Sequence, residues 1–447
     1  MLFYSTGNKI KPGQSFVLWG LDKEFQSVAI VGLGKKSKPK DEIELISEEK
    51  ESVRIAASVG CRALNAAGVK NIHVESLGDA EAAAEGSKLG TWKFQEFKTK
   101  KEALPEVSLY AIDQAESVKW ERGAVKAAAQ NMARRLADTP SNLMTPTIFA
   151  ENARDMAKSL NISVEVHDKQ WAEREKMGAF LAVAQGSCEP PKFLELSYAN
   201  SDQDPFVLVG KGVTFDSGGI SIKPSSGMDA MRADMSGAAC VLSALYGLAS
   251  LKVPVNVRAL IPLVENMPSG TAIKPGDVVR ARNGKTISID NTDAEGRLIL
   301  ADALSYSAIY KPKWVLDIAT LTGAIIIAVG GAATGVFTNS DKLYNILQEA
   351  GSNSGDRVWR FPLWKFYTKQ LTENNAYDIN NVGKVRGGGS CTAAAFLKEF
   401  VPEKIDWLHL DMAGVMGPDD KTPYLTKGMT GRPTRTLIEF IEAQAKC

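Results

Sequence analysis

The fold of this chain is decided by the stretch Phe206-Val-Leu-Val-Gly-Lys-Gly-Val-Thr-Phe-Asp216. It opens with an unbroken apolar run, which is typical of a strand covered by helices on both faces. Further apolar runs follow along the chain with helical patterns between them. This alternation predicts an α/β fold, built from βαβ units around a largely parallel sheet. The expected strands of this region are residues 193–196, 206–209, 255–263, 314–318 and 407–410.

The quoted strand carries polar residues into a glycine-rich loop. Lys211 and Asp216 lie among glycines, which permit close backbone approach and positive φ. Lys223 follows, and Asp234 precedes a helix that we expect Ser236 to cap. Because ligands bind at the carboxyl edge of the strands in open α/β sheets, we expect these side chains to lie at that edge.

A second polar cluster follows an alternating strand at residues 285–290 and reads Asn291-Thr-Asp-Ala-Glu-Gly-Arg297. If the backbone stays extended there, Asp293 and Glu295 project to one side, because residues two apart on a strand share a face. Arg297 then opens the next helix. The pattern predicts that this cluster also begins at a strand end.

The two clusters together hold four carboxylates, two lysines and an arginine. Any single aspartate could be a helix cap or half of a salt bridge, but four anions in a cleft of low dielectric repel one another unless a cation lies among them. His73, His167 and His409 lie outside both clusters, which argues against a histidine-rich zinc site and a histidine general base. The set favours a hydrolase with two divalent metals held mainly by oxygen: zinc, manganese or magnesium. One lysine can ligate a metal as the neutral amine, and a second, charged lysine can polarise a carbonyl.

The composition limits the possible partners. The 53 basic and 52 acidic residues give a net charge of +1, so we expect no nucleic acid and no membrane, but a small neutral substrate. Five cysteines, odd in number and far apart, favour a reducing cytosol over a disulfide framework. We identify no export or transit segment. The uncharged stretch 318–340 is rich in Gly, Ala and Thr, so we expect a buried strand and loop rather than a membrane span.

The length of 447 residues suits two domains. We expect a small α/β domain over residues 1–117, with strands at 28–31 and 72–74 and helices at 48–67 and 79–90. An alanine-rich pattern predicts a linker helix over 118–138, which Thr139-Pro140 stops. Residues 139–447 would then form the catalytic domain.

The chain resembles the leucyl aminopeptidase family of dizinc exopeptidases in two motifs: Asn-Thr-Asp-Ala-Glu-Gly-Arg-Leu at 291–298, which is highly specific to it, and Gly-Lys-Gly-Val-Thr-Phe-Asp-Ser-Gly-Gly at 210–219. The likeness continues through Glu-Asn-Met-Pro-Ser-Gly at 265–270, Ala-Thr-Leu-Thr-Gly-Ala at 319–324 and Thr-Gly-Arg-Pro-Thr-Arg-Thr-Leu at 430–437. It covers nearly the whole chain and is strongest toward the animal cytosolic members. The resemblance implies a small, macro-like N-terminal domain joined by a helix to a larger domain, whose central mixed, mainly parallel sheet is flanked by helices.

The resemblance also implies roles for individual residues. One metal would be held by Asp216, Asp293 (also through its backbone carbonyl) and Glu295, and the other by Lys211, Asp216, Asp234 and Glu295. Lys223 would polarise the scissile carbonyl, and Arg297 would hold a bicarbonate ion that acts as general base. The pocket for the first side chain of the substrate, suited to leucine or methionine, would be lined by Met231, Thr320, Gly323, Val382 and Ala413. From the residues alone, these five would be ordinary core.

The activity implied is release of N-terminal amino acids, preferably leucine and other apolar residues, from short peptides by a metal-activated water. The implied assembly is a homohexamer with enclosed active sites. The animal members carry several dozen residues before the segment matching 16–34, so we expect the small domain to lack its first strand and helix.

Three alternatives remain open at this point. A cysteinylglycine-type dipeptidase of glutathione turnover could use the same site. A metal-dependent phosphoesterase could use the same carboxylates and lysines, but would need more basic residues at its mouth. A DNA-binding or structural role is disfavoured by the neutral net charge and the complete set of ligand residues.

Overall fold

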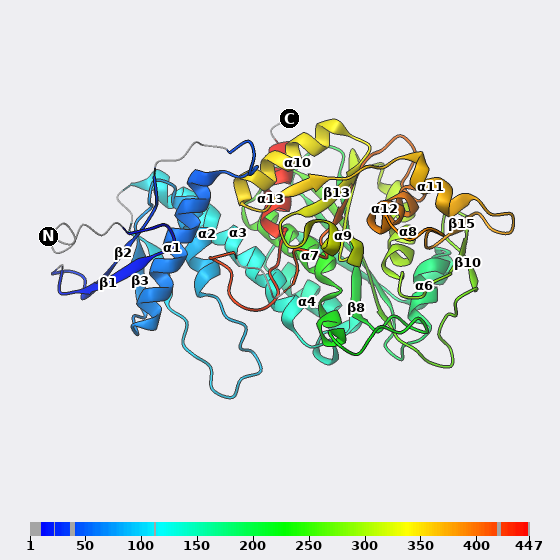
Figure 1. Cartoon of the computed structure of the whole chain (residues 1–447), viewed down its shortest axis with the longest axis horizontal. Helices are drawn as coiled ribbons and strands as arrows, with labels where there is room; N and C mark the ends of the chain where they lie inside the picture. Colours follow the sequence, from blue (N-terminus) through cyan, green and yellow to red (C-terminus); the bar gives the residue numbers. More distant parts are fainter. Residues whose placement is uncertain (1–9, 22, 36–40, 111–112, 418–421, 446–447) are drawn as a thin grey trace.

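The computed structural model describes residues 10–21, 23–35, 41–110, 113–417 and 422–445. Figure 1 shows a smaller N-terminal domain beside a larger domain that contains most of the sheet. None of the described helices is long and apolar enough to cross a membrane.

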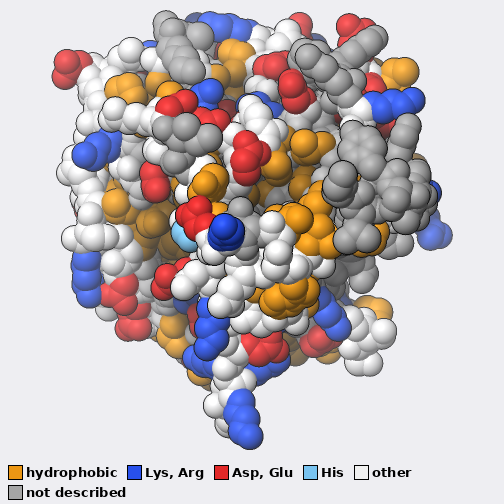
Figure 2. All heavy atoms as spheres, turned by 90° about the vertical axis from the view of Figure 1, so that its left-hand side faces the viewer, with side chains coloured by type: hydrophobic (Ala, Val, Ile, Leu, Met, Phe, Trp, Pro, Cys, Tyr) orange, Lys and Arg blue, Asp and Glu red, His pale blue; other side chains and the backbone are white. Residues whose placement is uncertain are grey.

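The described residues of the N-terminal domain form two separate strand pairs and two helices. β1 (Ser15–Trp19) pairs antiparallel with β2 (Ser27–Val31), and β3 (Asn71–Val74) pairs parallel with β4 (Glu106–Leu109). Helices α1 (Glu48–Ala66) and α2 (Ala80–Thr91) pack on each other. The expected strands and helices of this region are present, whereas β1 and β4 were missed. Figure 2 shows the outer face of this domain, where side chains of both charges alternate with hydrophobic ones.

Helix α3 (Gln114–Asp138) is longer than the predicted linker by four residues at its start. It begins there because Asp113 accepts a hydrogen bond from the N–H of Glu116 and caps the helix. It is more than a connection, because it packs against α2 of the small domain and against α7 (Ser236–Ser250) and α13 (Thr434–Gln444) of the large one.

The large domain is built on a mixed, mainly parallel sheet. The strand order is β14-β13-β16-β12-β7-β9-β6-β5, and β8 pairs with the far end of β9. The pairs β12/β16, β12/β7, β7/β9, β8/β9 and β13/β14 are parallel. All five expected apolar strands are confirmed. The sheet strands are β5 (Ile162–His167), β6 (Lys192–Ala199), β7 (Phe206–Gly210), β8 (Gly212–Asp216), β9 (Asn256–Asn266), β12 (Trp314–Ala319), β13 (Thr334–Thr338), β14 (Val358–Arg360) and β16 (Asp406–Asp411).

Helices cover both faces of this sheet, as the unbroken apolar strands require. One buried cluster packs the sheet against α3, α4 (Pro146–Ala157), α7, α10 (Asp341–Ser354) and α13. The other packs it against α5 (Lys169–Arg174), α6 (Gly178–Ala184), α8 (Gly296–Tyr306), α11 (Lys365–Thr372) and α12 (Gly389–Lys398). A small outlying sheet holds β10 (Val278–Arg280), β11 (Thr286–Ser288) and β15 (Ile379–Asn380).

Two local predictions were wrong. Ser236 is the first residue of α7 rather than its cap, and its hydroxyl donates to the carbonyl of Ala233 at 2.6 Å. The stretch 318–340 contains a short helix, α9 (Gly323–Val329), between the end of β12 and β13. Thr322 starts that helix by accepting a hydrogen bond from the N–H of Ile325.

Candidate metal centre

The polar residues of both clusters meet at the carboxyl edge of the large sheet. Lys211 lies between β7 and β8, and Asp216 is the last residue of β8. Asp234 follows the 3-10 helix η2 (Met228–Ala233) and directly precedes α7. Asp293 and Glu295 lie in the turn that leads into α8. Four separate segments therefore supply one site.

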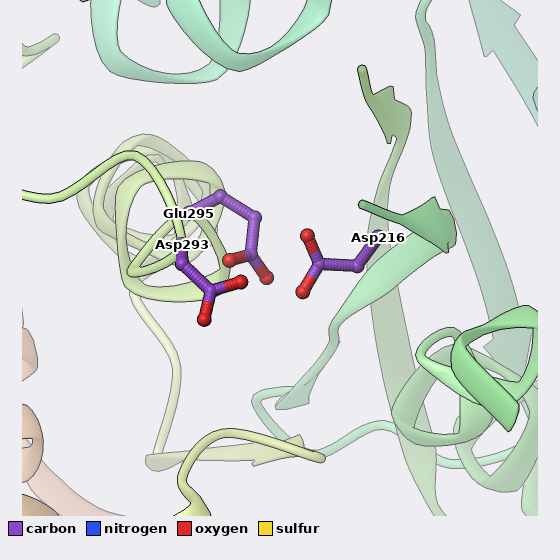
Figure 3. A group of neighbouring side chains, drawn as sticks. All are labelled: Asp216, Asp293 and Glu295. Atoms are coloured by element: carbon purple, nitrogen blue, oxygen red, sulfur yellow. The ribbon is translucent and has the colours of Figure 1, made fainter. Parts of the chain in front are cut away.

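Three carboxylates converge at this edge. Asp216, Asp293 and Glu295 each offer one oxygen, and these atoms lie within 4.8 Å of one another. In Figure 3, Asp216 points from its strand toward the other two side chains. Asp216 and Glu295 are 2% and 1% exposed, so their charges are removed from water. Such a group needs a cation among its oxygens.

The two lysines divide the carboxylates between them. The amine of Lys211 lies 2.8 Å from Oδ2 of Asp234 and 2.8 Å from Oε1 of Glu295. The amine of Lys223 lies 2.8 Å from Oδ2 of Asp216 and 2.6 Å from Oδ1 of Asp293. All the predicted metal-binding residues thus belong to one connected cluster, in which four carboxylates face two ammonium groups.

The pKa values of these groups are raised by burial and by neighbouring charges. Burial raises the pKa of Asp216, and the nearby Glu295 raises it further. Burial is also the main cause of the raised pKa of Asp234 and of Asp293. Burial opposes the charge of Lys211, but Asp234 and Glu295 outweigh that effect and raise its pKa. The two ammonium groups therefore do not balance the charge of the four carboxylates, and divalent metals would supply the missing positive charge.

Two oxygens of the cluster have bonding capacity left. Oδ2 of Asp234 and Oδ1 of Asp293 are buried and make no hydrogen bond of good geometry to any described residue. Each lies within 2.8 Å of a lysine amine. Carboxylate oxygens with free lone pairs are suitable donors for zinc, manganese or magnesium, so the residues present fit a metal site.

The backbone around Asp293 differs from the extended form that was expected. Thr292 and Asp293 form a turn, in which the N–H of Ala294 donates to the carbonyl of Asn291 at 3.3 Å. The side chain of Asn291 accepts a hydrogen bond from the N–H of Asp293. Asp293 and Glu295 face the same cluster because of this turn, and not because of strand geometry.

Asn266 positions the first cluster against the second, and the metal-site prediction did not include it. Its side-chain amide donates to Oδ1 of Asp216 at 2.8 Å and to the carbonyl of Thr292 at 3.0 Å. Thr292 in turn donates its hydroxyl to the carbonyl of Gly218 at 2.6 Å. Asn266 lies within the quoted motif at 265–270, but nothing in its spacing indicated this contact.

Asn381 was also missed, and no sequence signal pointed to it. It is fully buried, and its Oδ1 accepts from the N–H of Asp290 at 2.8 Å while its amide donates to the carbonyl of Asn291 at 2.7 Å. Its own carbonyl accepts from Arg297 at 2.7 Å. Asn381 therefore binds the start of the second cluster, at Asn291, and its last residue, Arg297.

Arg297 has an unused donor. Its Nε is buried and has no hydrogen-bond partner among the described residues. Burial lowers the pKa of Arg297 to about 10, although Glu295 and Asp411 oppose the shift. A buried guanidinium with a free N–H is a suitable contact for a small anion.

The five residues expected around the substrate's first side chain are distributed over four segments. Met231 belongs to η2, Thr320 and Gly323 to the segment after β12, Val382 follows β15, and Ala413 follows β16. Thr320 bonds directly to the metal cluster, because its hydroxyl donates to Oδ1 of Asp234 at 2.6 Å and its carbonyl accepts from Lys211 at 2.8 Å. A Cβ added at Gly323 would meet no atom within 4 Å, so this position faces open space.

Comparison with protein families gives two matches along this chain. Residues 131–438 match the catalytic domain of the cytosol aminopeptidase family, and residues 7–101 match the N-terminal domain of that family. The two matches together span most of the sequence and include every residue of the cluster.

Individual relatives agree with these matches. The cytosol aminopeptidase of Xenopus tropicalis is 54% identical over 441 residues, which cover 97% of this chain and 84% of that protein. The cytosol aminopeptidase of Homo sapiens is 53% identical, with 98% and 84% covered. Among solved structures, the bottromycin maturation enzyme BotP in complex with Mn superposes with a TM-score of 0.90 at 34% identity, covering 99% of this chain and 96% of that one.

Proposed function

Because the chain belongs to the cytosol aminopeptidase family, M17, and is therefore a metal-dependent aminopeptidase acting on peptides, we propose how its own residues perform that reaction. The observation that carries the proposal is the cluster itself: three carboxylate oxygens within 4.8 Å of one another, with Asp234 and two lysines joined to them. The alternatives considered above, a cysteinylglycine-type dipeptidase and a phosphoesterase, gain no support from the relatives.

The cluster would hold two divalent ions. Asp216, Asp293 and Glu295 would hold one of them, with the backbone carbonyl of Asp293 as a further ligand. Lys211, Asp216, Asp234 and Glu295 would hold the other, so Asp216 and Glu295 would serve both ions. Zinc fits these ligands, with manganese or magnesium at one of the positions. When bound, the ions supply Lewis acidity and lower the pKa of the attacking water.

Lys223 and Arg297 complete the machinery. Lys223 is less buried than Lys211, with 20% of its side chain exposed against 3%, so its amine can reach a substrate carbonyl and stabilise the charge that develops there. The Nε of Arg297, which has no partner among the described residues, would hold a bicarbonate ion, and that ion would supply a general base in place of a histidine.

The preferred substrate is a short peptide whose first residue is leucine or another apolar amino acid. Its side chain would lie among Met231, Thr320, Gly323, Val382 and Ala413. The open space at Gly323 supports a pocket at this point, and the hydrogen bond from Thr320 to Asp234 supports its position beside the ligands.

The boundaries, assembly and location belong to the same proposal. The domains extend over 1–117 and 139–447 with the linker at 118–138, which α3 covers. A homohexamer is supported by the large exposed hydrophobic side chains of α9 and α11, where Ile327 is 91% and Phe366 66% exposed. The cytoplasm is supported by the relatives' names.

Removal of charge from the ligands tests the proposal. Asp293→Asn and Glu295→Gln preserve volume but remove a charged donor, so each should lower kcat by about a thousandfold or more, since the metals supply most of the charge stabilisation. Hydrolysis of leucine p-nitroanilide measures this, and circular dichroism should show the fold retained. A variant that keeps most of its activity contradicts the ligand assignment.

A further inference from the structure

Asp411 is buried at the end of β16, and its only effect described above is that its charge opposes the lowering of the pKa of Arg297. It is 1% exposed and pairs with Ala319, the last residue of the neighbouring strand β12. Both strands end at these positions. Among the described residues, one further backbone bond joins the segments that follow them, from the N–H of Met412 to the carbonyl of Ala319 at 2.9 Å. The segments that follow must therefore be held by something other than strand pairing.

The carboxylate of Asp411 takes over that role. Its Oδ1 accepts hydrogen bonds from the N–H groups of Leu321 at 3.1 Å, Thr322 at 3.4 Å and Ala413 at 3.4 Å. Its Oδ2 accepts the hydroxyl hydrogen of Thr322 at 2.6 Å. One side chain thus binds the loop after β12 and the turn after β16 at once, and a carboxylate is the side chain with enough acceptor sites to do so.

Thr322 extends the connection to two helices. Its hydroxyl lies 2.7 Å from that of Ser390, in the first turn of α12, and accepts from the N–H of Ile325 at the start of α9. The polar groups of Asp411 and Thr322 are therefore fully engaged with one another and with these segments.

The segments joined in this way carry the walls of the substrate pocket. Thr320 and Gly323 flank the two residues whose N–H groups Asp411 binds, and Ala413 is bound directly. We propose that Asp411, acting with Thr322, is a positioning residue that sets the width of the pocket for the first side chain and so the preference for leucine over smaller residues. This inference rests on the proposed function.

A purely structural role would have a different consequence. Loss of a buried carboxylate lowers stability wherever it lies. A change in the preference between two substrates occurs only if the pocket walls move, because effects on the metals or on the amount of folded enzyme cancel in a ratio. The ratio of kcat/KM for leucine p-nitroanilide to that for alanine p-nitroanilide is therefore the informative quantity.

Asp411→Ala should lower this ratio by about tenfold, which is the range that one methylene contributes in an apolar pocket. The metal content per chain should stay at the wild-type value. Should Asp411→Ala fail to fold, Thr322→Val tests the same connection from its other end and should also lower the ratio, whereas Thr322→Ser, which keeps the hydroxyl, should restore it.

Asp317→Asn is the matched control. Asp317 is as buried as Asp411 and lies two residues before Ala319 on β12, but it bonds to Trp407 and His409 within the sheet rather than to the pocket segments. It should lower the melting temperature and leave the ratio unchanged. A ratio within twofold of wild type in Asp411→Ala or Thr322→Val, or an equal fall in Asp317→Asn, overturns the inference. Activity surviving in Asp293→Asn would instead overturn the proposed function.

Discussion

Lys211 and Lys223 have different partners, and this difference supports the proposal that one is a metal ligand and the other an electrophile. Lys211 is almost completely buried between Asp234 and Glu295, whereas Lys223 stands at the open side beside Asp293. The sequence predicted that these residues gather, because both clusters carry carboxylates and lysines between glycines. It did not predict Asn266 or Asn381, because a neutral amide shows its role only once two distant segments meet.

Gly323 offers a direct test of the pocket at the residue scale. It faces open space and lies outside the positive-φ region, so alanine should be accommodated without strain. The added methyl would occupy the pocket instead, and Gly323→Ala should lower kcat/KM for leucine p-nitroanilide by about tenfold or more. Hydrolysis of the alanine and glycine anilides should change much less. An equal loss for all three substrates would place the pocket elsewhere.

At the scale of the elements, the site depends on how closely α7 approaches the sheet. The N–H of Ala238 donates to the carbonyl of Lys211 at 2.9 Å, so the start of α7 holds the backbone that carries this lysine. Gly237 makes this possible, because a Cβ there would lie 2.2 Å from the carbonyl oxygen of Ile318 and 3.1 Å from the backbone nitrogen of Lys211.

Gly237→Ala should therefore displace Lys211 as well as lower the stability of the protein. Displacement of catalytic groups by about 1 Å can cost about a hundredfold in rate, and we expect a loss of that order in kcat with a fall in stability of about 1–3 kcal/mol. Gly247→Ala in the same helix is the control. Its Cβ would meet the side chain of Ile438, far from the cluster, so stability should fall while kcat is retained. Similar kcat values in the two variants would contradict this role of α7.

The elements that the sequence predicted are those whose burial leaves a pattern. The central strands β7, β9, β12 and β16 are mostly apolar because helices cover both of their faces. β1 and β4 are short, partly exposed strands of two-stranded sheets. β4 has no apolar run, and β1 was missed although it contains the run Phe16-Val-Leu-Trp19. The turn at Thr292 was missed although Asn291 is a common turn residue, whose side chain accepts from the N–H of Asp293. The alternating pattern before Asn291 was extended too far along the chain.

At the scale of the whole molecule, buried charges join the two domains. Glu85 of α2 is 1% exposed and accepts from Nε of Arg54 at 2.6 Å and from Arg435 of α13 at 2.7 Å. Burial by itself would raise the pKa of Glu85, but Arg435, Arg54 and Lys126 outweigh it and lower the pKa to about 2. The small domain is thus attached to the large one by an ionised carboxylate between arginines.

Glu85→Gln should destabilise the protein by about 3–5 kcal/mol at pH 7, because it removes the carboxylate that two buried guanidinium groups share. The pKa of Glu85 is lower in the folded than in the unfolded chain, so its contribution is complete above pH 4.5 and is lost as the pH falls toward 2. Urea unfolding of the wild type and of Glu85→Gln between pH 7 and pH 3 should show that their difference in free energy of unfolding becomes smaller as the pH falls. Glu96→Gln is the control. Glu96 forms an exposed ion pair with Arg135, 3.9 Å long, so this substitution should change the free energy of unfolding little at any pH. A difference for Glu85→Gln that stays constant from pH 7 to pH 3 would contradict this account.

The central claim is that buried carboxylates without a histidine among them work by holding two divalent metals. The most direct test is the hydrolysis of leucine p-nitroanilide before chelation, after chelation and dialysis, and after zinc or manganese is added back, with metal content measured at each stage. We predict that chelation abolishes activity while the fold is retained, and that activity returns as two metal ions bind per chain. Full activity in protein shown to contain no metal would contradict the claim.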